Sequence, residues 1–152
     1  EVSSEKKFRL YVETLGQVQN DEGVFMRWAD NRLMRRMMRD SMFRNLQPRE
    51  TLTHWHYVRA SEMKHIIPFI ASVDFVLNSA MPYELPVLKQ RLFHYFPAAM
   101  EEFRGHPKRQ DAYLRAKRVY EMLAPLTEGA DESCIPSDAI LREFIGGSVY
   151  EY

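Results

Sequence analysis

Two short stretches rich in β-branched and aromatic residues, separated by a long helical connection, constrain the fold of this chain most strongly. Residues 7–14 (KFRLYVET) alternate around such side chains, and residues 72–80 (SVDFVLNSA) contain a nearly continuous apolar run, so both patterns indicate strands. Strands joined through helices pair in parallel, and a continuous apolar run is typical of a strand covered on both faces. We therefore predict a helix-dominated α/β fold with two parallel strands, the first of which leaves an open edge.

The connection between these strands contains an arginine-rich amphipathic helix at residues 31–45 (NRLMRRMMRDSMFRN). At about 100° per residue, arginines gather on one side and apolar residues on the other. The basic side carries Arg32, Arg35, Arg36 and Arg39, and the apolar side carries Leu33, Met34, Met37, Met38 and Met42. Asp40 is the only acid in this stretch after Asp30, so few i,i+4 partners are available. Because a guanidinium group suits bidentate binding of phosphate or carboxylate, we interpret this side as an unpaired anion-binding face, the alternative being a solvated charged surface.

The remaining pattern is mainly helical and contains no internal repeat. Asp30 is the expected N-cap of the arginine-rich helix, and Asn45 is expected to end it in a left-handed conformation. Further helices are predicted at residues 48–57, 59–70, 83–95, 97–103, 109–123 and 136–144. The glycine pair Gly146–Gly147 closes the last of them. We predict a single domain over residues 1–152.

Composition excludes several classes of protein. The chain has 21 basic and 21 acidic residues, so a general nucleic-acid or membrane coat is not expected. Cys134 is the only cysteine, which rules out an internal disulfide and fits a reducing compartment. No stretch approaches the roughly 20 apolar residues that span a bilayer, and the N-terminus lacks a signal-peptide core. We expect a cytoplasmic protein, and the first residue, which is not methionine, suggests a piece of a longer chain.

The histidines and aromatic residues at positions 54–59 form the second candidate site. His54 and His56 flank Trp55, but on a helix their side chains diverge by about 200°, so no metal site is predicted. The Trp55 ring has hydrogen-bonding neighbours and lies near Arg59 in the sequence. Such a combination is suited to binding a nucleobase or sugar next to a phosphate. The alternative is that Trp55 and Tyr57 belong to the core. No GxxxxGK[ST], GxGxxG, HExxH, CxxC or GxSxG motif occurs.

Several segments resemble the C-terminal half of the uridine kinase-like nucleoside kinases, within the phosphoribulokinase/uridine kinase family of P-loop kinases. They are DNRLMRRMMRD at 30–40, TLTHWHYVR at 51–59, VLNSAMPYELPVLK at 76–89 and IPSDAILREFIGGSVYEY at 135–152. The long bacterial members with extra N-terminal domains are the most similar. The resemblance implies a partial P-loop kinase fold, in which the two strands are the last two of a five-stranded parallel sheet.

The same resemblance implies a nucleotide-binding transferase in which residues of about 30–70 form a lid over the donor ATP. It implies Arg36, Arg39 and Arg44 as catalytic lid arginines, Arg35 as a cofactor contact, and His54, Trp55 and Arg59 as acceptor-side contacts. ATP and Mg2+ are implied as cofactors and a nucleoside-like molecule as acceptor. The phosphate loop, the magnesium-binding residues and the acidic base belong to the first half of the family's domain and are absent from these 152 residues. We therefore expect the chain alone to be inactive as a kinase. Asn45 replaces a usual glycine, and Arg27 replaces a usually small residue or proline.

Two alternatives remain open from the sequence. In the first, the chain is a non-catalytic module whose arginines bind a phosphorylated ligand, nucleic acid or an acidic partner. In the second, it is a structural module, and a second copy of the chain covers the open strand edge. Salt-sensitive binding of an oligonucleotide distinguishes the first, and an oligomer unchanged by ATP distinguishes the second.

Overall fold

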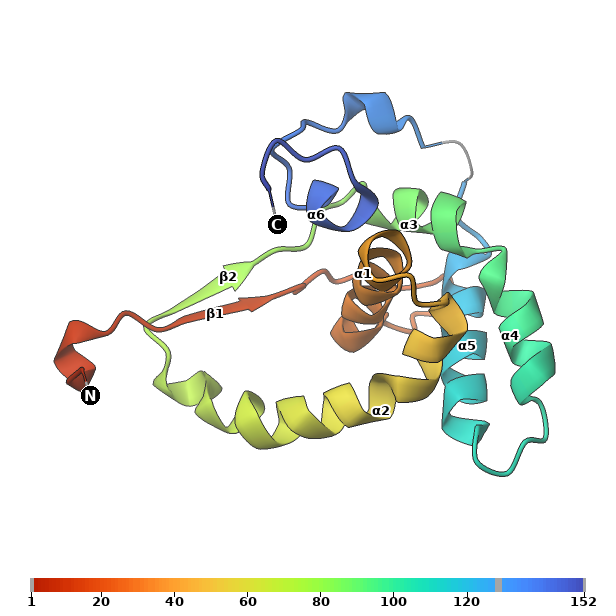
Figure 1. The fold of residues 1–152 in the computed structure, drawn as a ribbon, viewed down its shortest axis with the longest axis horizontal. Helices are drawn as coiled ribbons and strands as arrows, with labels where there is room; N and C mark the ends of the chain where they lie inside the picture. The colour runs from red at the N-terminus through yellow and green to blue at the C-terminus, as the bar shows by residue number, and fades with distance from the viewer. Residues whose placement is uncertain (1, 128–129, 152) are drawn as a thin grey trace.

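The computed structural model describes residues 2–127 and 130–151. In this part of the chain, β1 (Leu10–Glu13) and β2 (Phe75–Asn78) form a two-stranded parallel sheet that projects from a body of helices (Figure 1). The register pairs Leu10 with Phe75 and Glu13 with Asn78. The predicted parallel pair in a helix-dominated α/β fold is confirmed, although each strand is shorter than the sequence pattern indicated.

The connection between the strands consists of α1 (Trp28–Phe43), α2 (Pro48–His65) and the 3-10 helix η2 (Ile67–Ser72). The predicted N-cap is wrong: Arg27 is the N-cap, and Asp30 lies buried in the first turn. Asn45 has a φ of 52°, which confirms its left-handed conformation.

One continuous α2 replaces the two helices predicted at residues 48–57 and 59–70. Tyr57 and Val58, at the predicted break, are neither glycine nor proline, so nothing interrupts the helical hydrogen bonds there. Pro68 lies beyond α2, in the first turn of η2, where its missing N–H leaves no bond unmade.

The second half supplies α3 (Glu84–Leu92), α4 (Tyr95–Phe103) and α5 (Gln110–Leu123), followed by η3 (Glu132–Cys134) and α6 (Arg142–Ile145). Near the N-terminus lies the 3-10 helix η1 (Ser4–Lys6). The last helix is shorter than predicted and ends at Gly146, whose φ is 85°. No helix within the described residues is both long and apolar enough to cross a membrane.

The apolar side of α1 forms the centre of the core. Helix α1 contacts α2, α3 and α6, while α5 packs against α2, α3 and α4 (Figure 1). The largest fully buried side chains include Leu33, Met34, Met37, Leu52, Leu88, Leu92, Phe96 and Phe103. Met42 departs from the predicted buried side and remains 45% exposed, because it lies in the last turn of the helix.

The strands themselves are poorly covered. Phe75, Val76 and Leu77 of β2 are 54%, 43% and 39% exposed, and Leu10 and Val12 of β1 are exposed to a similar extent. The predicted burial of the second strand on both faces is therefore wrong for this chain. The helices pack mainly on one another around α1, and the described residues supply no second layer over the sheet.

A buried ion pair joins α1 to α3. The Arg35 guanidinium binds the Glu84 carboxylate with two nitrogens, one at 2.8 Å, and a further bond of 2.7 Å reaches the Ser79 carbonyl. Both side chains are almost fully buried. Breaking such a pair by removing one partner leaves an uncompensated buried charge, which is strongly unfavourable.

We predict that Arg35→Met lowers the free energy of unfolding by about 3–5 kcal/mol, because Glu84 is left buried without its cation. Urea denaturation followed by circular dichroism measures the change. The double variant Arg35→Met/Glu84→Leu should recover most of the loss. Arg49→Met is the matched control, because the Arg49–Glu102 pair is exposed and should cost less than about 1 kcal/mol. Equal losses in the single and double variants would contradict this explanation.

Candidate functional site

Every arginine of the 31–45 stretch contacts a carboxylate, so the predicted unpaired arginine face is wrong. The pairs are Arg32 with Glu13 and Glu62, Arg35 with Glu84, Arg36 and Arg44 with Asp40, and Arg39 with Glu143. Apart from Asp40, these partners belong to β1, α2, α3 and α6. Only folding brings them to α1, which explains why the spacing of charges along the helix did not indicate them.

Exposure divides these arginines into two kinds. The Arg35 side chain is 7% exposed and its donors are already used, so the implied cofactor contact from Arg35 requires the pair with Glu84 to open. The side chains of Arg36, Arg39 and Arg44 are 35%, 31% and 49% exposed. Guanidinium groups on this exposed side can therefore meet a ligand without unpacking the core.

A small pocket lies where the parallel strands end, and we call it the strand-end pocket. Its volume is about 260 Å³. Its lining includes Val12, Glu13, Thr14, Ser79, Arg32, Arg35, Arg36, Arg39 and Phe144. The guanidinium carbon of Arg39 lies 5.9 Å from the centre of the Phe144 ring, within the range of a cation–π contact. Because ligands of open parallel sheets bind beyond the carboxyl ends of the strands, this pocket has the expected position for an anion site.

A larger central cavity of about 730 Å³ lies between the sheet, α1, α2 and α5. Of the predicted acceptor-side residues, Trp55 and Arg59 line this cavity, whereas His54 does not. The Nδ1 atom of His54 instead lies 2.9 Å from the carbonyl of Glu50, one turn earlier on α2. His56 lines the cavity, because residues two apart on a helix point in different directions.

The aromatic residues of α2 also have different environments. Trp55 is 4% exposed, which confirms the core alternative for this ring. Tyr57 is 66% exposed, so its predicted core position is wrong. The edge of the Trp55 side chain contributes to both the central cavity and the strand-end pocket.

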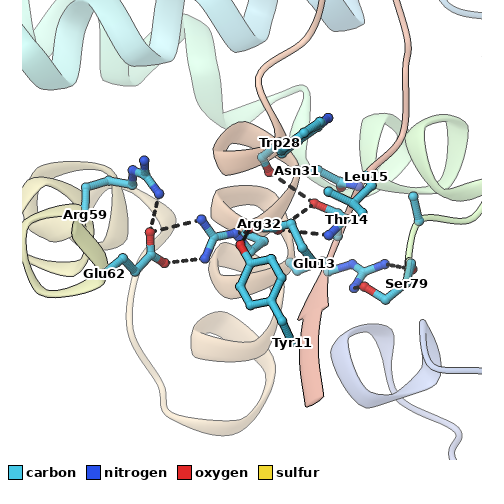
Figure 2. A network of polar contacts seen from close by, with 12 residues as sticks. Tyr11, Glu13, Thr14, Leu15, Trp28, Asn31, Arg32, Arg59, Glu62 and Ser79 are labelled. Atoms are coloured by element: carbon cyan, nitrogen blue, oxygen red, sulfur yellow. Dashed lines mark hydrogen bonds and ion pairs between the residues drawn. The ribbon is translucent and has the colours of Figure 1, made fainter. Parts of the chain in front are cut away.

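A polar network lies at the end of β1 (Figure 2), and two of its residues, Glu13 and Arg32, line both the central cavity and the strand-end pocket. The Tyr11 hydroxyl donates to the buried Glu13 carboxylate at 2.9 Å, and Arg32 lies 2.9 Å from the same carboxylate as an ion pair. Arg32 and Arg59 both bind Glu62 of α2. The network therefore connects the end of β1 to α1 and α2 through the ion pairs of Glu13 and Glu62 with arginines.

The environment of Tyr11 alters its acidity. Two effects raise the pKa of Tyr11 to about 12. The larger is burial of the phenol, and the next is its hydrogen bond to the Glu13 carboxylate. The neutral phenol is favoured because the phenolate would lie beside a carboxylate in a partly desolvated site.

Sequence reasoning missed a row of charged side chains on α5. Asp111, Arg115 and Arg118 all line the central cavity. Arg118 binds the buried Asp30 carboxylate with two bonds of 2.7 Å, which explains why Asp30 is not free to cap α1. Their spacing of four and three residues was an available signal, because it places all three on one side of a helix.

The side chains of these sites can contact a ligand mainly through the positive charge of guanidinium groups and through hydrogen bonds. Within residues 2–127 and 130–151, no group of three or more His, Cys, Asp or Glu side chains has the arrangement of a metal site. Comparison with protein-family models, with curated proteins and with solved structures finds no match for this chain.

We predict that Tyr11→Phe removes one phenolate step near pH 12 from the titration of the eight tyrosines, measured by ultraviolet absorbance. The folded-state pKa of Tyr11 is raised from 10.0 to about 12, so the unfolded chain loses this proton first. The contribution of the neutral phenol to stability is complete below pH 10 and is lost as pH rises toward 12. An unchanged titration in the Tyr11→Phe variant would contradict the assignment.

Proposed function

We propose that this chain is the C-terminal part of a uridine kinase-like nucleoside kinase, in which Arg36, Arg39 and Arg44 contact the phosphates of the donor nucleotide. The observation that carries the proposal is the position of the strand-end pocket. Two part-exposed guanidinium groups of α1, from Arg36 and Arg39, line it at the carboxyl ends of two neighbouring parallel strands. This is the combination that the sequence resemblance implied for a phosphoryl-transfer lid.

The ion pairs of these arginines are compatible with phosphate binding. Arg36 and Arg44 share the single carboxylate of Asp40, at 3.2 and 3.1 Å, so one anion serves two cations. Arg39 and Glu143 meet at 3.3 Å with both side chains about one-third exposed. A phosphate that approaches from solvent adds the missing negative charge, and guanidinium groups aimed at a transferring phosphoryl group stabilise its transition state.

The central cavity is the proposed acceptor side. Its volume of about 730 Å³ lies within the usual range for small-molecule sites. His56, whose side chain is 47% exposed, offers a ring surface, and Trp55 contributes only the small part of its side chain that is not buried in the core. Arg59 lines the same cavity and pairs with Glu62. Aromatic walls with a few charged groups suit a nucleoside, whose base stacks and whose sugar hydroxyls form hydrogen bonds.

The described residues fit the two implied cofactors unequally. Arg36, Arg39 and Arg44 suit the polyphosphate of ATP, which in the reaction supplies the phosphoryl group. No three-ligand carboxylate or histidine group for Mg2+ is present within residues 2–127 and 130–151. Under this proposal, the phosphate loop and the metal ligands belong to a segment outside these 152 residues. The exposed apolar side chains of β1 and β2 offer a surface for such a segment to cover.

We predict that the chain binds ATP weakly, without turnover, and that Arg36→Met weakens this binding about tenfold, as expected for the loss of one charge-assisted hydrogen bond. Isothermal titration calorimetry measures the affinity, and Arg49→Met serves as the exposed-arginine control. Equal ATP affinity in the Arg36→Met variant would overturn the proposed phosphate contact. Salt-sensitive oligonucleotide binding without preference for ATP would favour the non-catalytic alternative instead.

A structural role in assembly is the second candidate, and the exposure of the sheet favours it. Val12 of β1 and Val76 of β2 are 49% and 43% exposed, and exposed apolar strands pair readily with another chain. In this case we expect light scattering to detect an oligomer that ATP does not change and that Val76→Lys dissociates. Glu101→Lys is the control, because it alters charge at an exposed position of α4, a helix that packs against α5 and α2. A chain that is monomeric at all concentrations tested would exclude this role.

A further inference from the structure

The segment at residues 142–150 contributes only Phe144 to the two pockets already discussed. It also lines a third one, which we call the C-terminal pocket. Its volume is about 470 Å³, and it lies against the last turn of α1. The lining includes Arg39, Arg44, Arg142, Gly146, Gly147 and Tyr150. The pocket therefore shares two arginines with the proposed function and adds residues that it leaves without a role.

Arg142 is a charged group with no carboxylate partner at ion-pair distance among the described residues. Its guanidinium donates to main-chain carbonyls instead, at 2.8 Å to Glu132 and 2.7 Å to Ile135. Its buried Nε atom has no hydrogen-bond partner. The nearby Glu132 carboxylate is held by Arg91, whose hydrogen bonds keep the pKa of Glu132 below its usual range, and the charge of Arg142 contributes to the same shift.

The wider cluster also has too few carboxylates for its cations. Four guanidinium groups, from Arg36, Arg39, Arg44 and Arg142, meet two carboxylates, those of Asp40 and Glu143. The Nε atom of Arg39 is buried without a hydrogen-bond partner, like that of Arg142. Among the described residues, these four cations outnumber by two the carboxylates that contact them, and a doubly charged anion would balance the difference.

The glycine pair holds the main chain close to these cations. Gly146 and Gly147 have φ values of 85° and 75°, which L side chains rarely adopt. A Cβ atom at position 147 would lie 3.3 Å from a terminal nitrogen of Arg142, and one at position 146 would lie 3.1 Å from the Met42 methyl. Glycine at both positions therefore allows the chain to turn around the guanidinium of Arg142, and no side chain at these positions extends from the backbone.

We propose that the C-terminal pocket binds a phosphorylated small molecule that carries two negative charges and a planar ring. Arg39, Arg44 and Arg142 provide the cations for its phosphate groups. The exposed rings of Phe43 and Tyr150 line the same pocket and provide apolar surface for the ring. This inference deepens the proposed function and rests on it for the roles of Arg39 and Arg44, and it makes the 142–150 segment part of the binding site.

The test is a nuclear magnetic resonance titration of the 15N-labelled chain with ADP and, separately, with pyrophosphate. Both probes should shift the amide signals of Gly146 and Gly147, and ADP should bind more tightly because its base meets the aromatic rings. Arg44→Met should weaken both probes about tenfold, the effect of one charge-assisted hydrogen bond. Arg44 is half-exposed, so this variant retains the fold even if Arg142→Met does not.

The controls separate this inference from the proposed function. Arg36 lines the strand-end pocket but not the C-terminal pocket, so pyrophosphate should still shift the signals of Gly146 and Gly147 in the Arg36→Met variant. Arg49→Met should have no effect on either probe. Glycine amides that do not move, or that move equally in the Arg44→Met variant, overturn the C-terminal pocket without touching the ATP contact of Arg36. Equal affinities for ADP and pyrophosphate overturn the ring contact.

Discussion

The ion pairs that radiate from α1 determine how the rest of this structure is arranged. The apolar side of the helix is buried in the core, and its basic side carries guanidinium groups to carboxylates from four other elements. Arg35 anchors α3 through Glu84, and Arg32 joins β1 to α2 through Glu13 and Glu62. A charge enclosed in this way is tolerable only when paired, so these contacts hold the strand ends, α2 and α3 in one relative position.

The arginines outside the buried pairs have fewer carboxylate partners than positive charges. Buried pairs such as Arg35–Glu84 are satisfied and leave no capacity for a ligand. Arg36, Arg44 and Arg142 differ, because the first two share Asp40 and the third contacts main-chain carbonyls. Fixed cations that outnumber their fixed anions suit an anionic ligand, which under the proposed function is a phosphate.

Local sequence signals predicted much of the fold. Alternation at residues 7–14, the apolar run at residues 72–80 and the long helical separation indicated β1 and β2 as a parallel pair. The 3.6-residue period indicated the buried side of α1. Asn45 was recognised because few residues other than glycine adopt a left-handed conformation readily. The start of α1 was misjudged, because the Asp30 carboxylate binds Arg118, which lies 88 residues away in the sequence. Period and propensity carry no information about such distant partners.

The sequence by itself determined that this chain has one arginine-rich amphipathic helix, a parallel strand pair and residue types suited to phosphate binding. Tertiary structure alone decided which arginines remain available. Arg35 is withdrawn into the core, while Arg36 and Arg39 reach the strand-end pocket. It also decided that His56 rather than His54 lines the central cavity. The physical reason is that the availability of a charge depends on its counter-ions and burial, and both are supplied by elements far along the chain.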